Sequence, residues 1–235
     1  MYKDLAKYYD LMYNWKDYPK EVHKIKDLIK KYKKTDGNKL LDVGCGTGKH
    51  LEYLKDEYSC IGIELNEEIL SIAKNNVNDV IFKRADMINF DLKNNFDIII
   101  CLFSSIGYVK TYSNLKKTIV NFANHLRNGG LVIIEPWFTK STYRVGHPGM
   151  TTYDGEDIKI ARLNIAKIEN NLSIMDMHHL IVERNKDVQY FIDKHELGLF
   201  EIDSFLEIMN EAGFKAEFLE DGLMKDRGLY IGTKS

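Results

Sequence analysis

The sequence predicts an α/β fold: a doubly wound, mostly parallel sheet of seven strands, with an antiparallel β insert after the fifth strand. Two observations support this prediction. Between residues 36 and 140, short apolar runs alternate with helical patterns, and the runs are almost uninterrupted, as in parallel strands buried on both faces. After Thr139 the alternation ends and several β-like runs follow one another, which is typical of antiparallel strands.

Length and charge set the broad class of protein. A chain of 235 residues fits one domain with a core of its own. Its net charge of −2, from 33 basic and 35 acidic residues, argues against a general electrostatic role on nucleic acid or on an anionic membrane. We expect a single domain in four parts: a helical cap over 1–35, a ligand-binding core over 36–140, the insert over 141–200, and a C-terminal helix and strand pair over 201–235.

The helical cap and the first strand begin the chain. Apolar residues recur at helical spacing over residues 19–34, with lysines between them, and predict an amphipathic helix; they are Val22, Ile25, Leu28, Ile29 and Tyr32. The apolar run Leu40–Val43 predicts the first strand. A glycine loop, Gly44–Gly48, follows this strand directly.

The next segments continue the alternation. Cys60–Ile63 predicts a second strand, which ends at Glu64. Asn66 can cap the helix that follows, because its side chain can accept a hydrogen bond from a free amide of the first turn. Val80–Phe82 and Phe96–Phe103 predict the third and fourth strands.

A helix and a fifth strand complete the parallel part. Ser113 can cap this helix, whose inward positions would be Leu115, Ile119, Phe122 and Leu126. The turn sequence Asn128-Gly129-Gly130 would end the helix before a strand over Leu131–Ile134.

The rest of the chain holds the insert and the C-terminal part. Residues 157–200 contain three β-like runs, separated by the turn sequences Asn170-Asn171 and Arg184–Asp187. A helix is expected over Ile202–Ala212, with Gly213 at its end. Two strands should follow, near 214–219 and 228–233.

The glycine loop is the strongest functional signal. Its three glycines, Gly44, Gly46 and Gly48, let a flat adenosine-bearing ligand lie against the main chain. The spacing is G-x-G-x-G, whereas a dinucleotide site uses G-x-G-x-x-G to place a pyrophosphate on the helix N-terminus. Because Glu64 ends the second strand, where an acidic side chain can accept both ribose hydroxyls, we predict a nucleoside ligand without phosphates.

On these residues the chain resembles the class I S-adenosylmethionine-dependent methyltransferases, which have a Rossmann-like fold, over nearly its whole length. The resemblance rests on Asp42–Gly48, Glu64, Ala85-Asp86-Met87 and the terminal strand pair. A narrower resemblance is to bacterial enzymes that N,N-dimethylate the amino group of nucleotide-linked deoxyaminosugars. It rests on Tyr8-Tyr9-Asp10, Lys16-Asp17-Tyr18, Cys101–Gly107, Ile134–Trp137 and Arg227-Gly228-Leu229.

The resemblance implies S-adenosylmethionine as cofactor and S-adenosylhomocysteine as its product. Tyr9 and Tyr18 would close over the methionyl end, and Gly44, Cys45 and Gly46 would lie against the cofactor. Glu64 would hold the ribose, and Leu65 beside it belongs to the same set. Asp86 would accept the adenine amino group, Met87 would pack on the ring, and Leu102 with Phe103 would border the sulfonium.

The narrower resemblance implies a small-molecule substrate, a sugar nucleotide. Our candidates for its side of the site are Ser104, Ser105, Trp137, His195 and Arg227. The forked donors of Arg227 suit the oxygens of a diphosphate. His195 and Trp137 also have plainer interpretations, as a strand histidine and a core tryptophan, but Trp137 follows the fifth strand, where open α/β sheets bind ligands.

Tyr108 departs from the narrower pattern, because the aminosugar enzymes carry histidine after Ser-Ile-Gly. A tyrosine near its reference pKa of about 10 is chiefly a hydrogen-bond donor at neutral pH. The proton of the amine would then leave through water or Tyr2, or the substrate differs. Tyr108 and Tyr2 are therefore the candidate catalytic residues.

Metal and nucleic-acid chemistry are disfavoured. His178 and His179 are adjacent on a strand, so they point to opposite faces and cannot share an ion, and we expect no metal. Cys101 lies in an apolar strand without a preceding proline, which disfavours covalent attack on a pyrimidine. Leu102–Ser105 replaces the Asn/Asp-Pro-Pro-aromatic run of exocyclic-amine DNA methyltransferases, so no nucleic-acid partner is expected.

Two rival functions stay open: a methyltransferase for another small N or O nucleophile, and a non-catalytic S-adenosylmethionine-binding module that engages a partner. The β-runs of the insert could pair two copies by their edges, which predicts a homodimer. Three cysteines cannot all pair within one chain, and the longest apolar run is far shorter than the roughly 20 residues that cross a membrane. We therefore expect a cytoplasmic protein without membrane attachment.

Overall fold

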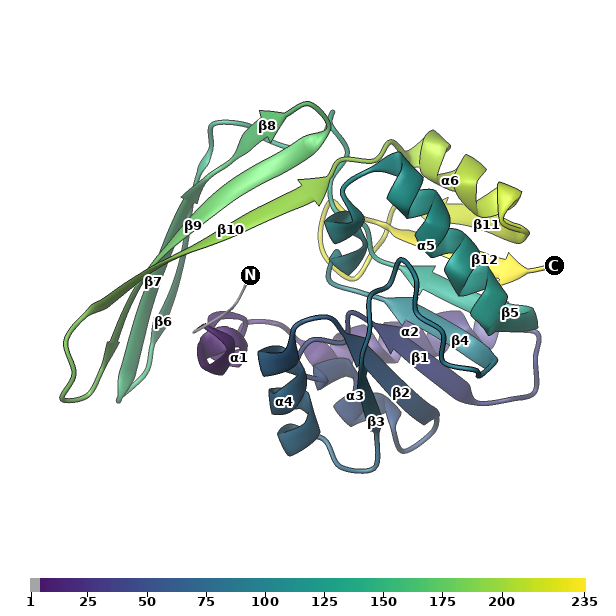
Figure 1. Cartoon of the computed structure of the whole chain (residues 1–235), viewed down its shortest axis with the longest axis horizontal. Coiled ribbons are helices and arrows are strands. Elements are labelled where there is room, and N and C mark those ends of the chain that lie inside the picture. Colours follow the sequence, from purple (N-terminus) through teal and green to yellow (C-terminus); the bar gives the residue numbers. More distant parts are fainter. Residues whose placement is uncertain (1–4) are drawn as a thin grey trace.

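The computed structural model describes residues 5–235, and its largest element is a seven-stranded sheet in the order β11-β12-β5-β4-β1-β2-β3 (Figure 1). β1 to β5 run parallel, whereas β12 is antiparallel to both β5 and β11. The predicted doubly wound, mostly parallel sheet is confirmed. Its strands are β1 (Lys39–Val43), β2 (Ser59–Glu64), β3 (Ile81–Arg84), β4 (Phe96–Cys101), β5 (Leu126–Ile134), β11 (Phe214–Leu219) and β12 (Leu229–Lys234).

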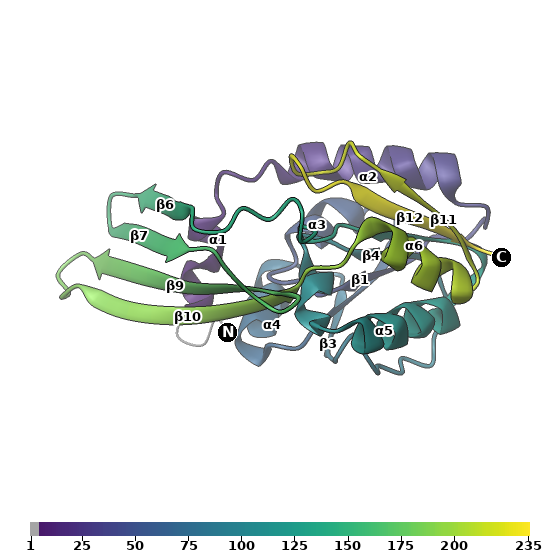
Figure 2. The ribbon, with the colours of Figure 1, turned by 90° about the horizontal axis from the view of Figure 1, so that it is seen from above.

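Helices cover both faces of this sheet. Figure 2 shows α2 on one side of the strands and α5 on the other. Leu115, Phe122 and Phe205 belong to the apolar cluster of the α5 side, and Ile25 and Leu51 to that of the α2 side. The helices are η1 (Ala6–Tyr8), α1 (Tyr9–Met12), α2 (Tyr18–Tyr32), α3 (Lys49–Leu54), α4 (Glu67–Asn76), η2 (Ser105–Val109), α5 (Tyr112–His125) and α6 (Ile202–Glu211).

Capping explains where α4 and α5 begin. As predicted, Asn66 caps α4, because its side chain accepts a hydrogen bond from the Ile69 amide at 2.9 Å. The predicted cap of α5, Ser113, is wrong. Thr111 has the extended backbone of a cap residue, and its hydroxyl accepts from the Asn114 amide at 3.2 Å, which leaves Ser113 inside the first turn.

The predicted end of α5 at residues 128–130 is also wrong. The helix ends at His125, and the chain enters β5 without a turn. Leu126 already pairs with Phe96 of β4, and the register shifts before Leu131 pairs with Ile98. Strand pairing therefore takes these glycines into β5, with Gly129 at φ +80°.

The insert after β5 is a second, antiparallel sheet with the order β10-β9-β7-β6, and β8 pairs with β9. It extends from the core on the side where α1 lies (Figure 1). Both predicted turns are present, with Asn170 and Asn185 in the left-handed region. The first of the three predicted β-like runs forms two strands, β7 and β8. A further strand, β6, lies before residue 157, where the predicted runs begin. The strands are β6 (Pro148–Asp154), β7 (Ile158–Ile165), β8 (Lys167–Glu169), β9 (Leu172–Glu183) and β10 (Gln189–Gly198).

The N-terminal turns join the insert to the core. Tyr8 and Met12 pack against Ile160 of β7 and Ile181 of β9 in one apolar cluster. The inner face of the insert is therefore held over the carboxyl end of the core sheet. Of the residues described, no helix is both long and apolar enough to cross a membrane. All three cysteines are buried and unpaired.

Candidate functional site

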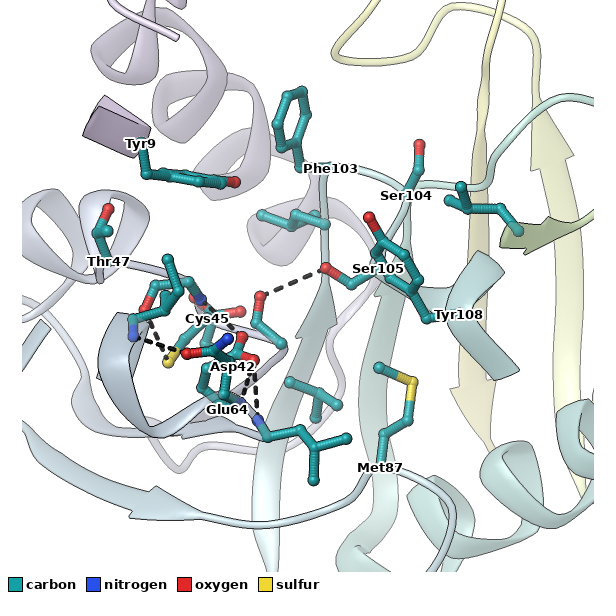
Figure 3. Close-up of a pocket in the computed structure, with 18 of the residues that line it drawn as sticks. Tyr9, Asp42, Cys45, Thr47, Glu64, Met87, Phe103, Ser104, Ser105 and Tyr108 are labelled. Carbon is teal, nitrogen blue, oxygen red and sulfur yellow. Dashed lines mark hydrogen bonds between the residues drawn. The ribbon is translucent and has the colours of Figure 1, made fainter. Parts of the chain in front are cut away.

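A pocket lies at the carboxyl ends of β1 and β4, where the strand order reverses and open α/β sheets bind their ligands (Figure 3). Its volume is about 320 Å³, which is within the usual range for small-molecule sites. Residues of the glycine loop, the N-terminal turns, the segment after β4 and the insert line it together.

The glycine loop forms one wall of this pocket. Gly44 has φ +72°, and a Cβ there would lie 2.8 Å from the Cβ and Oγ of Ser105, so the position requires glycine. The hydroxyl of Ser105 donates a hydrogen bond to the Gly44 carbonyl at 3.4 Å, drawn in Figure 3. A Cβ on Gly46 would meet only the Tyr9 hydroxyl, at 4.0 Å. The loop therefore leaves an open surface of main chain under Tyr9.

Two carboxylates lie behind the loop. Glu64 accepts hydrogen bonds from the amides of Leu65 at 2.8 Å, Asn66 at 2.9 Å and Gly46 at 3.3 Å. Burial raises the pKa of Glu64, and these three amides oppose the shift. Asp42 is 2% exposed, and burial raises its pKa to about 7. Within residues 5–235 its Oδ2 atom has no hydrogen-bond partner, so the pocket holds an acceptor that a ligand donor can satisfy.

Aromatic side chains of the N-terminal turns cover the opposite wall. Tyr9 contacts Tyr13 at a ring separation of 4.8 Å, and Tyr13 contacts Phe103 edge-on at 5.0 Å. Tyr18 packs edge-on against His50 at 5.0 Å. His50 in turn binds Glu21 at 2.8 Å, which ties α2 to α3 beneath this wall.

The chain after β4 bends sharply at Phe103 and Ser104, which have φ of +50° and +63°. Such angles are uncommon outside glycine and are held only by surrounding contacts. The Glu135 carboxylate accepts from the Phe103 amide at 2.7 Å, and the Ser104 hydroxyl donates to the Pro136 carbonyl at 2.7 Å. The end of β5 thus fixes the bend of β4.

Arg227 enters the pocket from the loop before β12. One of its terminal nitrogens donates to the Ser104 hydroxyl at 2.8 Å, and its guanidinium lies 4.6 Å from the Trp137 ring centre. Burial lowers its pKa. The charge of the Glu135 carboxylate opposes this shift, but among residues 5–235 no carboxylate forms an ion pair with Arg227, and its buried Nε atom has no hydrogen-bond partner. A buried cation whose donors are not paired directly with a carboxylate is suited to an anionic ligand.

A second arginine, Arg162, enters from β7 of the insert. It donates to the Tyr13 hydroxyl and to the Thr151 hydroxyl, both at 3.0 Å. Its buried Nε atom also has no partner within the described residues. Two arginine side chains, one from the core and one from the insert, therefore line the same cavity.

Tyr108 of η2 and His195 of β10 meet on the insert side of the pocket. The Tyr108 hydroxyl lies 2.6 Å from His195 Nδ1, and His195 Nε2 lies 3.0 Å from Asp193 Oδ2. His195 is 2% exposed and Asp193 is 5% exposed. The three side chains form a continuous hydrogen-bonded chain from the cavity into the protein.

The structure brings the predicted site residues together. Within residues 5–235, each of them lines this one pocket: Tyr9, Tyr18, Gly44, Cys45, Gly46, Glu64, Leu65, Asp86, Met87, Leu102, Ser104, Ser105, Tyr108, Trp137, His195 and Arg227. Tyr2, the remaining candidate, lies outside the described residues. His178 is exposed and His179 is buried, which confirms that they face opposite sides of the insert.

Several pocket residues were not predicted. Arg162, Met175, Met177 and Leu197 come from the insert and line the cavity, and Asp193 supports His195 from behind. Only the alternation of side chains along β7, β9 and β10 marks them in the sequence, and alternation does not reveal which face of a sheet meets a pocket. In the described part of the chain, no group of His, Cys, Asp and Glu side chains has an arrangement that could hold a metal ion.

Comparison with known proteins agrees with this geometry. Residues 40–130 match the family model described as a methyltransferase domain. The chain is 35% identical to the dTDP-3-amino-3,4,6-trideoxy-alpha-D-glucopyranose N,N-dimethyltransferase of Streptomyces venezuelae, over 98% of both chains. The chain belongs to this methyltransferase family.

Solved structures extend the likeness to three dimensions. The methyltransferase matches the crystal structure of Streptomyces venezuelae DesVI with a TM-score of 0.92 and 34% identity, over 98% of each chain. It matches S-adenosylmethionine-bound CalS10, an amino pentose methyltransferase from Micromonospora echinaspora, with a TM-score of 0.87 and 25% identity, over 100% of this chain and 98% of that one. The protein is thus an S-adenosylmethionine-dependent N-methyltransferase, as predicted.

The pocket of the methyltransferase fits this cofactor. The backbone at Gly44 has no room for a side chain, which lets a ligand lie against it. Among residues 5–235 the Asp42 Oδ2 atom has no hydrogen-bond partner, and Glu64 lies at the end of β2. When bound, S-adenosylmethionine supplies an activated methyl group. The protein must therefore align an acceptor and exclude water.

Proposed function

We propose that this methyltransferase N,N-dimethylates the amino group of a dTDP-linked deoxyaminosugar. The observation that carries the proposal is the pair Arg162 and Arg227, two cations that form no ion pair among residues 5–235 and whose Nε atoms have no hydrogen-bond partner there, in the cavity beside the cofactor loop. A nucleoside diphosphate offers two adjacent anionic groups to such a pair. The relative from Streptomyces venezuelae, which covers the whole domain, is named for a dTDP-aminosugar.

On the cofactor side, we propose that Glu64 accepts the ribose hydroxyls and that Asp42 accepts a donor of the ligand near the glycine loop. Asp86 would accept the adenine amino group, with Met87 and Leu65 packed on the base. Tyr9, Tyr18 and Leu102 would enclose the methionyl end and the sulfonium. The support is position: these side chains line one cavity, and Tyr9 stands directly over Gly46.

On the substrate side, we propose that Arg227 and Arg162 bind the diphosphate and that Trp137 forms the floor beneath Arg227. Ser104 positions Arg227, because its hydroxyl accepts from the guanidinium while donating to Pro136. Ser105 holds the glycine loop through the Gly44 carbonyl. These contacts hold the anion subsite rigid before a ligand enters.

Calorimetric titration of dTDP, UDP and dTDP-aminosugars into protein saturated with S-adenosylhomocysteine tests this function. We expect the nucleotides to bind, and Arg227→Gln and Arg162→Gln each to weaken dTDP binding by roughly tenfold or more, the loss of a charged hydrogen bond. Arg144→Gln, which removes an exposed arginine, is the matched control. Absence of nucleotide binding, together with turnover of a phosphate-free amine or hydroxyl compound, would support the rival small-molecule function.

We also propose that the outer face of the insert joins two copies of the chain. Two rows of aligned side chains cross β6, β7, β9 and β10 there: Met150, Leu163, His178 and Ile192, then Thr152, Ala161, Leu180 and Tyr190. Met150 is 72% exposed, and most of the other apolar members are close to half exposed. Lys159 and Asp154, at one end of the rows, already form an ion pair with each other, so the face between the charged edges is apolar and can pack against a second copy of itself about a twofold axis.

Sedimentation velocity tests the homodimer. The wild-type chain should sediment as a dimer and Leu180→Glu as a monomer, because a buried charge in the centre of the face has no partner. Val120→Glu, which alters an exposed apolar residue of α5, should leave the dimer intact. A monomeric wild-type chain at all concentrations would overturn this proposal. We further propose a cytoplasmic location, which three unpaired cysteines favour.

A further inference from the structure

We propose that Tyr108, His195 and Asp193 form a relay that takes the proton from the substrate amine. The inference rests on the proposed N-methylation of an amino sugar. An alkyl amine, like lysine with its reference pKa of about 10.4, carries a proton at neutral pH and has no free electron pair. It must lose this proton before it can accept a methyl group, and again before a second methyl group.

The relay starts in the cavity and ends inside the protein. Tyr108 and His195 both line the pocket, while Asp193, two residues before His195 on β10, lies on the same face of the strand. Figure 3 shows the ring of Tyr108 beside Ser105, on the same side of the pocket as Ser104. Close packing fixes η2 against β10, because a Cβ on Gly107 would lie 2.9 Å from Leu197.

The hydrogen-bond partners determine the tautomer of His195. A carboxylate only accepts, so Nε2, at 3.0 Å from Asp193, carries the proton of the neutral ring. Nδ1 is then an acceptor, and the Tyr108 hydroxyl donates to it at 2.6 Å. Tyr108 also lines the cavity, and a phenolic oxygen has two lone pairs, so an ammonium group bound beside it can donate to this oxygen.

Proton transfer through this arrangement balances without an ionised tyrosine. An N–H bond of the ammonium breaks and an O–H bond forms at Tyr108, while the original O–H bond breaks and an N–H bond forms at His195 Nδ1. The nitrogen of the substrate keeps the electron pair. His195 becomes an imidazolium that Asp193 stabilises, and the proton passes to solvent when the product leaves. Tyr108 is thus a catalytic residue, and Asp193 is a positioning residue.

Other titratable groups surround the relay. His179 of β9 and Arg162 of β7 lie on the inner face of the same sheet, and Tyr9 faces Tyr108 from the N-terminal turns. The Lys110–Glu196 ion pair, at 2.6 Å, lies at the exposed end of β10. Asp193 is in hydrogen-bond contact with His195.

The first test is the pH dependence of kcat with S-adenosylmethionine and a dTDP-aminosugar. At pH 7, Tyr108→Phe should lower kcat by about 10²-fold or more, the usual contribution of general base catalysis. The Kd of S-adenosylhomocysteine should stay within twofold. The difference in kcat between Tyr108→Phe and the wild type should become smaller as the pH rises toward the pKa of the amine, because the substrate then loses its proton in solution.

Asp193→Asn should produce the same pH-dependent deficit as Tyr108→Phe. The control is Tyr53→Phe, since Tyr53 is an exposed side chain of α3 and is not among the residues that line the cavity. A deficit that is constant with pH would identify a merely structural contact and overturn the relay. Equal kcat in Tyr108→Phe and wild type would overturn it as well.

A second test needs no substrate, so it separates the relay from the proposed function. Long-range 1H–15N NMR of the histidine rings reports which nitrogen carries the proton. The neutral ring of His195 should carry its proton on Nε2, and Asp193→Asn should change the tautomer. A proton on Nδ1 of the neutral ring would overturn the relay. Failure of the wild type to methylate any dTDP-aminosugar, with the expected tautomer present, would instead overturn the proposed substrate.

Discussion

Replacement of Glu64 by alanine is the most direct test of the cofactor site. Glu64 is the acidic residue at the end of β2, and its carboxylate already accepts from three backbone amides, the weakest being Gly46 at 3.3 Å. A ribose at this position would add hydroxyl donors to the same carboxylate. Glu64→Ala removes the carboxylate that accepts from the Gly46 amide of the loop and that would accept from the ribose hydroxyls.

The expected loss of binding free energy in Glu64→Ala follows from these contacts. A hydrogen bond to a charged group contributes about 1.5–3 kcal/mol, and some of the loss is recovered because water can reach the ribose. We expect a loss of about 1–3 kcal/mol in binding, which is roughly a 5- to 150-fold increase in Kd. Calorimetric titration with S-adenosylhomocysteine measures it directly.

Two controls separate binding from folding. Glu64→Gln keeps one acceptor oxygen and should bind with intermediate affinity. Glu67→Ala removes an exposed carboxylate from the neighbouring first turn of α4 and should leave Kd unchanged. Circular dichroism must show that Glu64→Ala is folded at the titration temperature. An unchanged Kd in the folded Glu64→Ala protein would refute the ribose contact.

Three further predictions concern the loop, the insert and a helix cap. Gly44→Ala should abolish cofactor binding and lower Tm, since φ is +72° and the new Cβ would lie 2.8 Å from Ser105; a bound cofactor in this variant would contradict the requirement for glycine there. Burial lowers the pKa of His179 to about 4, whereas the unfolded chain protonates near 6.5. Stability should therefore fall as the pH decreases from 6.5 to 4, and His179→Gln should lose less Tm over this interval; identical Tm profiles would argue against a buried neutral His179. Thr111→Ala should lower the free energy of unfolding by about 1 kcal/mol and Ser113→Ala by much less, as urea denaturation would show, while equal losses would contradict Thr111 as the cap.

Local chemistry predicted the core and the cofactor side of the site. Gly44 and Gly46 follow the apolar run of β1, and Glu64 ends the run of β2, so strand and loop signals alone placed them at one sheet edge. Where the local signal was ambiguous, the prediction failed. Thr111 and Ser113 are both residue types that cap helices well, and the pairing of Leu126 with Phe96 ends α5 before the glycine turn that the sequence predicted as its end.

Glycine spacing and strand ends involve only a few neighbouring residues, and for that reason the chain could be predicted, before its fold was known, to have a nucleoside site after β1. The folded chain was needed to show that Arg162 of the insert lines the same pocket and that Asp193 lies behind His195. Arg162 and Arg227 are far apart in the chain, and Tyr108 reaches His195 across 87 positions. Such contacts depend on how β7 and β10 lie over the core sheet, and alternation along a strand carries no information about that placement.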